Sequence, residues 1–539
     1  MRPIGQVAAD LGIAEADLST YGKWVAKVLP VPKTGRRGKL VLVSAMTPTP
    51  YGEGKTVTAI GLSMGLRRLG RSSVVCVRQP SLGPVFGIKG GGAGGGKSTV
   101  EPLQEINMRF TGDTDAIGAA HNLLSSVIDN HIFHGNALGI DPAKVTWRRA
   151  IDLEDRALRH VRVGLGGEKG SVPRDDGFVV TAASEVMAVL CLSEGYAELK
   201  GALANIVVGE DGRGGPVRAE QLKVVGSMAA LLKDAMLPNL VQTSEGTPAL
   251  VHGGPFGNIA HGTSSLVSIG LGLSLAEFCV VEAGFATDLG AEKFFDIVAP
   301  RGGFNVDAMV VVATVRALRH HGGATPESLQ RPDAHEVELG LANLAKHLEN
   351  ARLFGLDPVV AINRFPSDSD GEISKVLEFC RSAGVDAAIS TCFSDGGSGA
   401  EELASLVVEA SARGARSRPL YLAGDSLETK VDKIVRSVYG GEGVAYADKA
   451  KDDILLLRGA GFEGYPVCVA KTALSLSDDP HKLGRPAGFV PSVRAVETSA
   501  GAGFNVVFMG DIVTMPGLPS APAAERISLS DGGEVSGAL

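Results

Sequence analysis

A loop in the N-terminal part of the chain combines glycine, lysine and threonine in an order that suits polyphosphate binding. The loop follows an apolar run at 40–45, which predicts a strand, and precedes a helical pattern at 57–69. Such a loop directs backbone N–H groups and the positive end of the helix dipole at a bound anion. We therefore predict a nucleotide site formed by Thr49, Pro50, Tyr51, Gly52, Glu53, Gly54, Lys55 and Thr56.

Two of these residues have specific expected roles. Lys55 is placed to reach the β- and γ-phosphates of a nucleotide, and the Thr56 hydroxyl is placed to hold Mg²⁺. The loop departs from the pattern GxxxxGK[ST], because Thr49 occupies the first glycine position. The alternative is an ordinary turn between strand and helix, but such a turn does not explain a lysine after two close glycines.

A second segment matches the same pattern letter for letter. Gly91, Gly96, Lys97 and Ser98 satisfy GxxxxGKS, but no predicted strand precedes them, and Pro102 obstructs a long helix after them. We interpret this segment as a glycine loop folded against the first phosphate site.

The elements that must position these loops alternate between strand and helix, which predicts an α/β fold with a P-loop NTPase-like parallel sheet core and two smaller α/β domains. Leucine and valine spacing predicts an amphipathic helix over 337–348. The expected domains are 1–350, which binds nucleotide, 351–445 and 446–539. The predicted strands are 40–45, 73–77, 178–181, 205–208, 308–312 and 359–362.

Composition restricts the class of protein. The 539 residues include 71 glycines, about 13% against a usual share of about 7%, and these cluster in loops rather than repeating with a period, which excludes collagen. Hydrophobic residues at 44% and charged residues at 21% exclude a largely disordered chain. The net charge of −8 gives no support to nucleic-acid binding.

The glutamates Glu277 and Glu282 argue against a membrane span at 266–286. Six scattered cysteines without CxxC spacing predict reduced core residues, and we expect a cytoplasmic protein.

The segment 78–91, Arg-Gln-Pro-Ser-Leu-Gly-Pro-Val-Phe-Gly-Ile-Lys-Gly-Gly, closely resembles a signature of the formate–tetrahydrofolate ligases. The resemblance covers nearly the whole chain, because further motifs follow in the order of that family. These motifs are Phe110 to Asp113, Asp129 to His131, Thr146 to Arg149, Val251 to Phe256, Glu282 to Phe285, Lys482 to Pro486 and Thr514 to Pro519.

The resemblance implies that ATP and formate give formyl phosphate and ADP, and that the N10 amine of tetrahydrofolate then takes the formyl group. It places Lys55 and Thr56 at the phosphates and Mg²⁺, and Arg78 at formyl phosphate. A planar guanidinium binds phosphate oxygens bidentately and stays charged. A salt bridge at the strand end is the alternative role for Arg78. The family also implies a homotetramer.

Three phenylalanines are expected to form the folate pocket. By resemblance, Phe365 within Ile-Asn-Arg-Phe-Pro holds the pterin ring, Phe393 stands where the family has tryptophan, and Phe285 is a third aromatic residue. A phenylalanine in place of tryptophan offers less stacking area. Taken alone, each of them is more typical of core packing than of a ligand site; the family match favours the ligand role for Phe365 and leaves both roles open for Phe393.

Other positions depart from the family pattern. Gln79 replaces a glutamate associated with monovalent-cation activation, which puts cation dependence in doubt, since an amide binds a cation more weakly than a carboxylate. Lys97 replaces tyrosine, Arg109 replaces histidine, and Asp395 replaces a lysine. These changes leave two alternatives open: an altered substrate preference, or a drifted paralogue that binds nucleotide or folate without ligase turnover.

Several polar residues within the matched motifs cannot be ranked by sequence. Asp113, Asp129 and His131 are candidates to orient formate, Mg²⁺ or the attacking amine, whereas His252 and His261 are expected to shape the backbone near the substrate or to form structural hydrogen bonds. A zinc site is not expected, because no cluster with metal-ligand spacing accompanies the histidines. An ATPase with a partner-protein output is a third hypothesis, but it leaves the folate-like motifs unexplained. The unranked residues are Asp113, Asp129, His131, His252 and His261.

Overall fold

A computed structural model describes residues 1–30, 38–50, 52–89, 91–167 and 171–537. Its central feature, within these residues, is a 12-stranded sheet. Seven neighbouring strands of this sheet are parallel, as the alternation of strand and helix predicts. In sheet order they are β15 (Pro248–Val251), β4 (Ser73–Val77), β16 (Phe278–Glu282), β3 (Lys39–Ala45), β17 (Ala308–Ala313), β18 (Val359–Asn363) and β19 (Ala387–Ser390).

The remaining strands extend the sheet beyond β15 in antiparallel pairing. β5 and β6 pair with each other as a hairpin, and β6 also pairs with β14. These strands are β14 (Asn239–Thr243), β2 (Val25–Val28), β1 (Leu18–Tyr21), β6 (Ser98–Glu101) and β5 (Gly94–Gly95).

Helices cover both faces of the parallel strands, which explains why those strands are almost continuously apolar. Successive side chains of a strand point to opposite faces. Val41 and Val43 accordingly pack with helices α2 (Lys55–Arg68) and α15 (Glu401–Ala412), whereas Leu40 and Leu42 belong to the larger core on the other side. That larger core includes residues of α9 (Leu266–Leu275), α11 (Val315–His321) and α12 (Ala334–Leu353).

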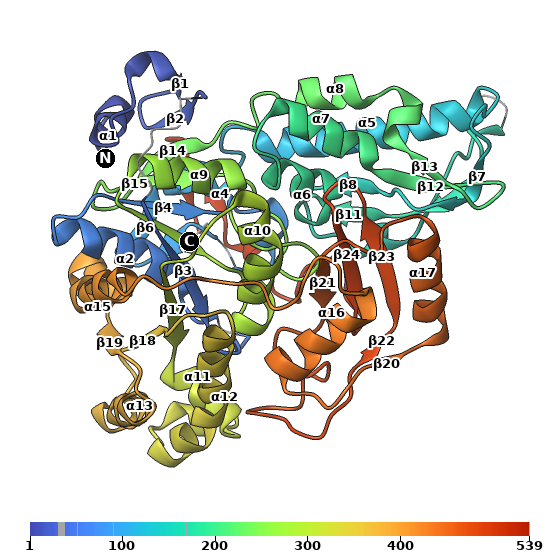
Figure 1. Ribbon diagram of the computed structural model, residues 1–539. Helices are drawn as coiled ribbons and strands as arrows, with labels where there is room; N and C mark the ends of the chain where they lie inside the picture. The colour runs from blue at the N-terminus through green and yellow to red at the C-terminus, as the bar shows by residue number, and fades with distance from the viewer. Residues whose placement is uncertain (31–37, 51, 90, 168–170, 538–539) are drawn as a thin grey trace.

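Two further groups of elements lie beside the sheet (Figure 1). One group contains four helices and a three-stranded sheet, β13–β12–β7, and the other contains the three-stranded sheet β21–β24–β23 with α16 and α17. The first comprises α5 (Asp113–Phe133), α6 (Glu185–Cys191), α7 (Tyr196–Asn205), α8 (Val225–Leu231), β7 (Ile140–Val145), β12 (Val207–Asp211) and β13 (Pro216–Arg218). The second comprises α16 (Leu427–Lys433), α17 (Asp448–Gly459), β21 (Val467–Ala470), β23 (Ala495–Ser499) and β24 (Phe504–Phe508).

Most predicted elements are confirmed, and one is shifted. The predicted helix 337–348 lies within α12, but the predicted strand 205–208 begins late, because Asn205 still ends α7 and β12 starts at Val207. The domain limits at 350 and 445 stay a prediction; β18 and β19, on the C-terminal side of residue 350, belong to the same sheet as β3.

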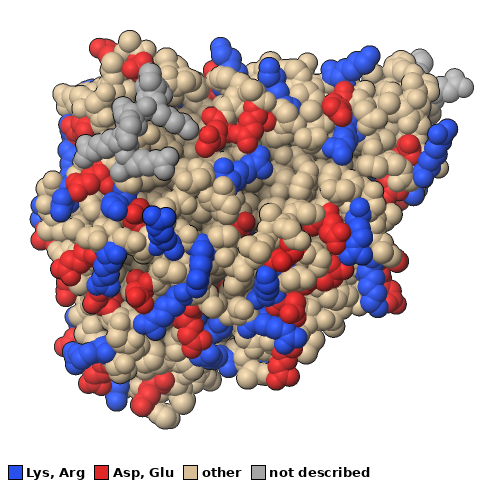
Figure 2. Space-filling view, viewed as in Figure 1, with Lys and Arg blue, Asp and Glu red and all other residues tan. Residues whose placement is uncertain are grey.

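The surface and the cysteines agree with the composition. Basic and acidic side chains are interspersed over the face shown in Figure 2. All six cysteines are buried and free, as predicted for reduced core residues. Within the described residues, none of the helices has the length and apolar character that crossing a membrane requires.

Candidate active site

The predicted phosphate loop lies at the carboxyl edge of the parallel strands, between β3 and α2. Gly54 is the residue before the helix, and its φ of 76° lies in the left-handed region that favours glycine. Gly52 adopts a similar φ of 79°. Lys55 and Thr56 therefore form the first turn of α2, where the N–H groups of a helix attract anions. Tyr51 lies outside the described residues, and Pro50 is exposed.

The Glu53 side chain shapes the loop from inside. Its carboxylate is 2% exposed and accepts hydrogen bonds from the Thr49 backbone N (2.7 Å) and the Thr49 hydroxyl (3.0 Å). The hydroxyl of Thr314, at the end of β17, donates to its other oxygen at 2.5 Å. Thr49 stands where the phosphate-loop pattern has glycine, and its hydrogen bonds to Glu53 join the two ends of the loop.

A carboxylate that ends β16 joins the phosphate loop to the predicted arginine. Glu282 accepts a hydrogen bond from the Thr56 hydroxyl at 2.6 Å, and its other oxygen is 3.4 Å from Nη2 of Arg78. Arg78 directly follows β4, which pairs with β16. The ends of three neighbouring parallel strands therefore bring together the hydroxyl, the carboxylate and the guanidinium.

The backbone is shaped to hold the Arg78 guanidinium in place. Its Nη1 donates to the Pro255 carbonyl at 3.3 Å, and a Cβ on Gly284 would lie 3.3 and 3.4 Å from its two terminal nitrogens. The Nε atom is buried and has no hydrogen-bond partner within the part of the chain that the structure describes. Arg78 thus has a strand-end salt bridge with Glu282 and keeps an unused donor.

The second glycine motif has a different structure from the first. Gly96 and Lys97 form the turn of the β5–β6 hairpin, and the Ser98 hydroxyl donates to the carbonyl of Cys392 at 2.7 Å. No helix follows Lys97 directly, so the letter-perfect match is not a strand–loop–helix phosphate loop. The hairpin packs on α2 through Gly94, whose added Cβ would lie 2.8 Å from Ile60.

This glycine hairpin supports one of the predicted aromatic residues. A Cβ on Gly96 would lie 2.1 Å from the Phe393 carbonyl oxygen, and one on Gly95 would lie 3.2 Å from the Phe393 ring. The Lys97 backbone N also donates to the Phe393 carbonyl at 2.8 Å. Phe393 is 54% exposed, so much of its surface is free for contact with a ligand.

The two other aromatic residues follow β18 and β16, which end at the same edge of the sheet with β3 and β17 between them. Phe365 comes two residues after β18, and the Arg316 guanidinium lies 4.9 Å above its ring. Phe285 comes three residues after β16 and packs on Gly257, where a Cβ would lie 3.1 Å from its ring. Its φ of 59° is rare outside glycine, and such backbone strain concentrates at functional sites.

A sequence model of the family described as formate–tetrahydrofolate ligase matches residues 1–539. The chain belongs to this family. Membership makes it an enzyme, a ligase of one-carbon metabolism with the small-molecule substrates formate, ATP and tetrahydrofolate. The predicted resemblance is thereby confirmed over the full chain.

A metal ion is usual in this family, and the oxygens at the phosphate loop fit one. Thr56 and Glu282 present a hydroxyl and a carboxylate 2.6 Å apart, and Mg²⁺ prefers such oxygen ligands. Among the described residues, no group of three or more His, Cys, Asp or Glu side chains is arranged to hold a metal ion by itself.

The unranked polar residues of the ligase have structural partners. Asp113 begins α5 and forms a buried ion pair with Lys27 at 2.7 Å. Asp129 pairs with Arg149 and Arg174, and His131 accepts a hydrogen bond from the Leu138 backbone N at 3.0 Å. Arg109 pairs with Asp115 on the surface.

The two remaining histidines are buried and neutral. Burial lowers the pKa of His252 to about 4 and of His261 to about 3. His252 bonds to Ser265 and to the Ala235 carbonyl, at 2.5 and 2.7 Å. Neither ring nitrogen of His261 has a partner among the described residues, and the residue is fully buried.

Sequence reasoning gave no role to three residues that line the candidate site, although two of them, Glu282 and Asn363, stand within family motifs. Glu282, Thr314 and Asn363 each end a parallel strand, or follow it directly, at the edge where Lys55 and Arg78 lie. A polar residue that terminates an apolar run was the available signal, since ligands in α/β sheets bind at the carboxyl ends of strands. Without the order of the strands, the signal does not identify which residues meet.

Proposed function

We propose that the enzyme ligates formate to tetrahydrofolate through formyl phosphate, on a P-loop NTPase-like core. The observation that carries this proposal is the chain of contacts from Thr56 through Glu282 to Arg78. These contacts link the N-terminus of α2, which suits the phosphates of ATP, to the Arg78 guanidinium, which suits formyl phosphate. Both lie on the same sheet edge as the exposed aromatic surface of Phe393.

The first step activates formate. A formate oxygen attacks the γ-phosphorus of ATP, a new P–O bond forms, and the bond to the β-phosphate oxygen breaks to release ADP. Lys55 and the first turn of α2 bind the phosphates, and Arg78 stabilises charge on the transferred group. Thr56 would help to hold Mg²⁺, which when bound would neutralise further phosphate charge.

The second step transfers the formyl group. The N10 amine attacks the formyl carbon, the C–O bond to phosphate breaks, and the amine loses its proton as phosphate leaves with the electron pair. Phe365, Phe393 and Phe285 hold the flat pterin by stacking. Arg78 stays close to the leaving phosphate, which would favour its departure as an anion.

Isotope transfer tests this route. Purified protein is incubated with MgATP, ¹⁸O-labelled formate and tetrahydrofolate, and both products are analysed by mass spectrometry. We expect 10-formyltetrahydrofolate together with inorganic phosphate that carries one ¹⁸O atom. Product with unlabelled phosphate would contradict formyl phosphate. If the folded protein binds nucleotide and folate without forming product, it is a drifted paralogue.

Three further properties stay proposals; two follow from family membership and the third from Gln79, which departs from the family pattern. We propose a homotetramer, a cytoplasmic location and weak dependence on monovalent cations. The last proposal concerns Gln79, which is buried, and whose backbone N donates to the Gly253 carbonyl at 2.6 Å. Its side chain supplies a neutral amide rather than a carboxylate to any cation nearby. Activity in sodium and potassium salts at equal ionic strength tests this point.

A further inference from the structure

The entrance to the phosphate loop is held by three side chains from distant helices. Thr47 is the second residue after β3, and its backbone N donates to Nε2 of His347 at 2.8 Å. Nε2 of His321 donates to the Thr47 carbonyl at 3.1 Å, and Nδ2 of Asn343 donates to the Thr47 hydroxyl at 2.9 Å. Every polar group of Thr47 is therefore engaged.

The contact with the Thr47 amide determines the tautomer of His347. Because Nε2 accepts a hydrogen bond from the backbone N–H, the ring proton must lie on Nδ1. Nδ1 therefore donates to the Thr287 hydroxyl at 2.6 Å. Burial lowers the pKa of His347 to about 3, so the ring stays neutral at physiological pH and keeps one donor and one acceptor.

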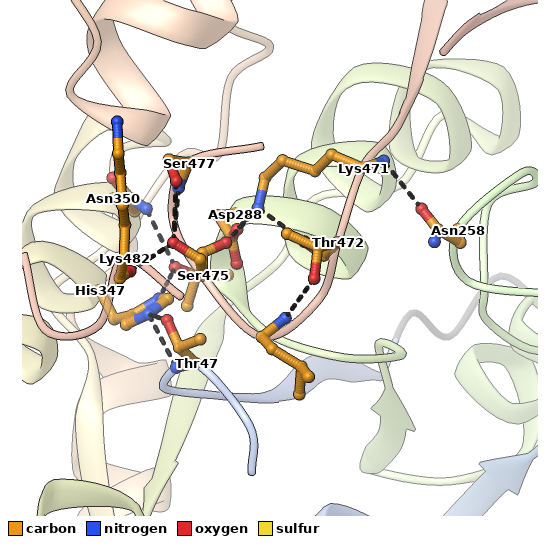
Figure 3. Close-up of polar contacts among 12 residues, drawn as sticks. Thr47, Asn258, Asp288, His347, Asn350, Lys471, Thr472, Ser475, Ser477 and Lys482 are labelled. Carbon is orange, nitrogen blue, oxygen red and sulfur yellow. Dashed lines mark hydrogen bonds and ion pairs between the residues drawn. The ribbon is translucent and has the colours of Figure 1, made fainter. Parts of the chain in front are cut away.

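Thr287 lies on the folate side of the site. It follows Phe285 by two residues, in the turn Thr287–Ala291 that continues the chain after β16. The next residue, Asp288, forms a fully buried ion pair at 2.7 Å with Lys471, the residue that directly follows β21 (Figure 3). His347 thus connects the loop after β3, which carries the predicted phosphate site, with the segment after β16, which carries Phe285 and follows Glu282 directly.

Two of these side chains, Asn343 and His321, also contact a C-terminal turn. Nδ2 of Asn343 donates to the Gly484 carbonyl at 2.7 Å, and the Gly484 backbone N donates to Nδ1 of His321 at 3.2 Å. Gly484 belongs to the motif 482–486, and Ser475 holds the preceding segment by donating to the Lys482 carbonyl at 2.6 Å. The C-terminal segment therefore contacts the side chains that hold Thr47.

We propose that His347 is a positioning residue that sets the phosphate loop and the folate-side loop relative to each other through its two ring nitrogens. The functional part of this inference rests on the proposed function. Each nitrogen serves one loop: Nε2 orients the loop of Lys55 through Thr47, and Nδ1 orients the loop of Phe285 through Thr287.

Two amide substitutions separate the two halves of this role. In His347→Asn the amide nitrogen takes the place of Nδ1, which keeps the donor to Thr287. The variant loses Nε2, which lies 2.8 Å from both the Thr47 backbone N and the Thr47 hydroxyl, and leaves the Thr47 N–H only its longer contact of 3.3 Å to Oδ1 of Asn343. In His347→Gln the amide oxygen takes the place of Nε2, which keeps the acceptor for Thr47 and removes the donor to Thr287. The two variants are matched controls for each other, because both replace the same buried ring by a neutral amide.

Hydrogen exchange of the ligand-free protein gives a readout that does not depend on activity. We expect His347→Asn to raise exchange about tenfold in a peptide covering 46–54 and by less than about threefold in one covering 283–291, since a lost buried hydrogen bond corresponds to roughly this change. His347→Gln is expected to show the reverse. Equal exchange of both peptides in both variants would overturn the proposal.

Ligand affinity provides the second readout. We expect His347→Asn to weaken ATP binding about tenfold with folate binding nearly unchanged, and His347→Gln to weaken folate binding more. If the exchange pattern is selective but the wild-type protein binds no ATP, the proposed function fails while the positioning role stands. If His347→Gln does not fold, Thr287→Val removes the same hydrogen bond by deleting the Thr287 hydroxyl. Equal exchange of the two peptides in Thr287→Val would likewise overturn the proposal.

Discussion

Replacing Gly54 by alanine is expected to damage the phosphate loop much more than the same change at Gly52. Both glycines adopt a left-handed conformation, with φ of 76° and 79°. A Cβ at Gly54 would lie 2.3 Å from Nδ2 of Asn363, whereas a Cβ at Gly52 would have no atom within 4 Å. Gly52→Ala is therefore a matched control for backbone strain without a clash.

The expected magnitude follows from two contributions. An alanine in the left-handed region costs about 1–2 kcal/mol at either position. At Gly54 the clash also displaces the buried Asn363 amide, which donates to the Glu53 carbonyl at 3.1 Å, and loss of a buried hydrogen bond costs about 1–3 kcal/mol. We expect Gly54→Ala to lower the free energy of unfolding by about 2–5 kcal/mol and Gly52→Ala by about 1–2 kcal/mol.

Urea unfolding of both variants measures these values, and ATP titration shows whether the loop still binds nucleotide. Gly54→Ala is expected to lose more ATP affinity than Gly52→Ala. Combining Gly54→Ala with Asn363→Ala should recover part of the stability, because the clashing amide is then absent. The reasoning is refuted if both single variants lose the same free energy, or if removal of the Asn363 side chain does not reduce the difference.

Three further predictions concern single residues. Lys55→Ala should abolish ATP-dependent turnover while the urea midpoint stays close to wild type; retained turnover in a coupled ADP assay would contradict its phosphate role. Phe365→Ala should weaken folate binding about tenfold and nucleotide binding little, by calorimetry, since one stacking contact contributes about 1.4 kcal/mol; equal losses would argue against stacking. Burial lowers the pKa of His121 from about 6.5 in the unfolded chain to about 4 in the folded protein. Between these pH values the unfolded chain binds one more proton than the folded protein, so the free energy of unfolding rises with pH. His121→Gln should reduce that slope by about 1.4 kcal/mol per pH unit between pH 4.5 and 6, measured by urea unfolding at several pH values; an unchanged slope would contradict a neutral buried ring.

Sequence was informative about this protein where the signal is local. The strand–loop–helix order around Lys55 was predicted from adjacent residues, a glycine before a helix and a helical pattern after it, and the structure has this order. The same local context gave the perfect match at Lys97 no strand before it and no helix after it, and Lys97 lies in a hairpin turn. Several motifs in one order identified the family.

The tertiary structure alone decided which of these residues meet. Thr56 and Glu282 are 226 positions apart, and they touch because β16 lies next to β3 in the sheet, an order that periodicity does not reveal. Asp113 sits in a family motif like Arg78, yet its partner is the buried Lys27. Parallel strands need long crossover connections, so the residues at their carboxyl ends come together only when the whole sheet has formed.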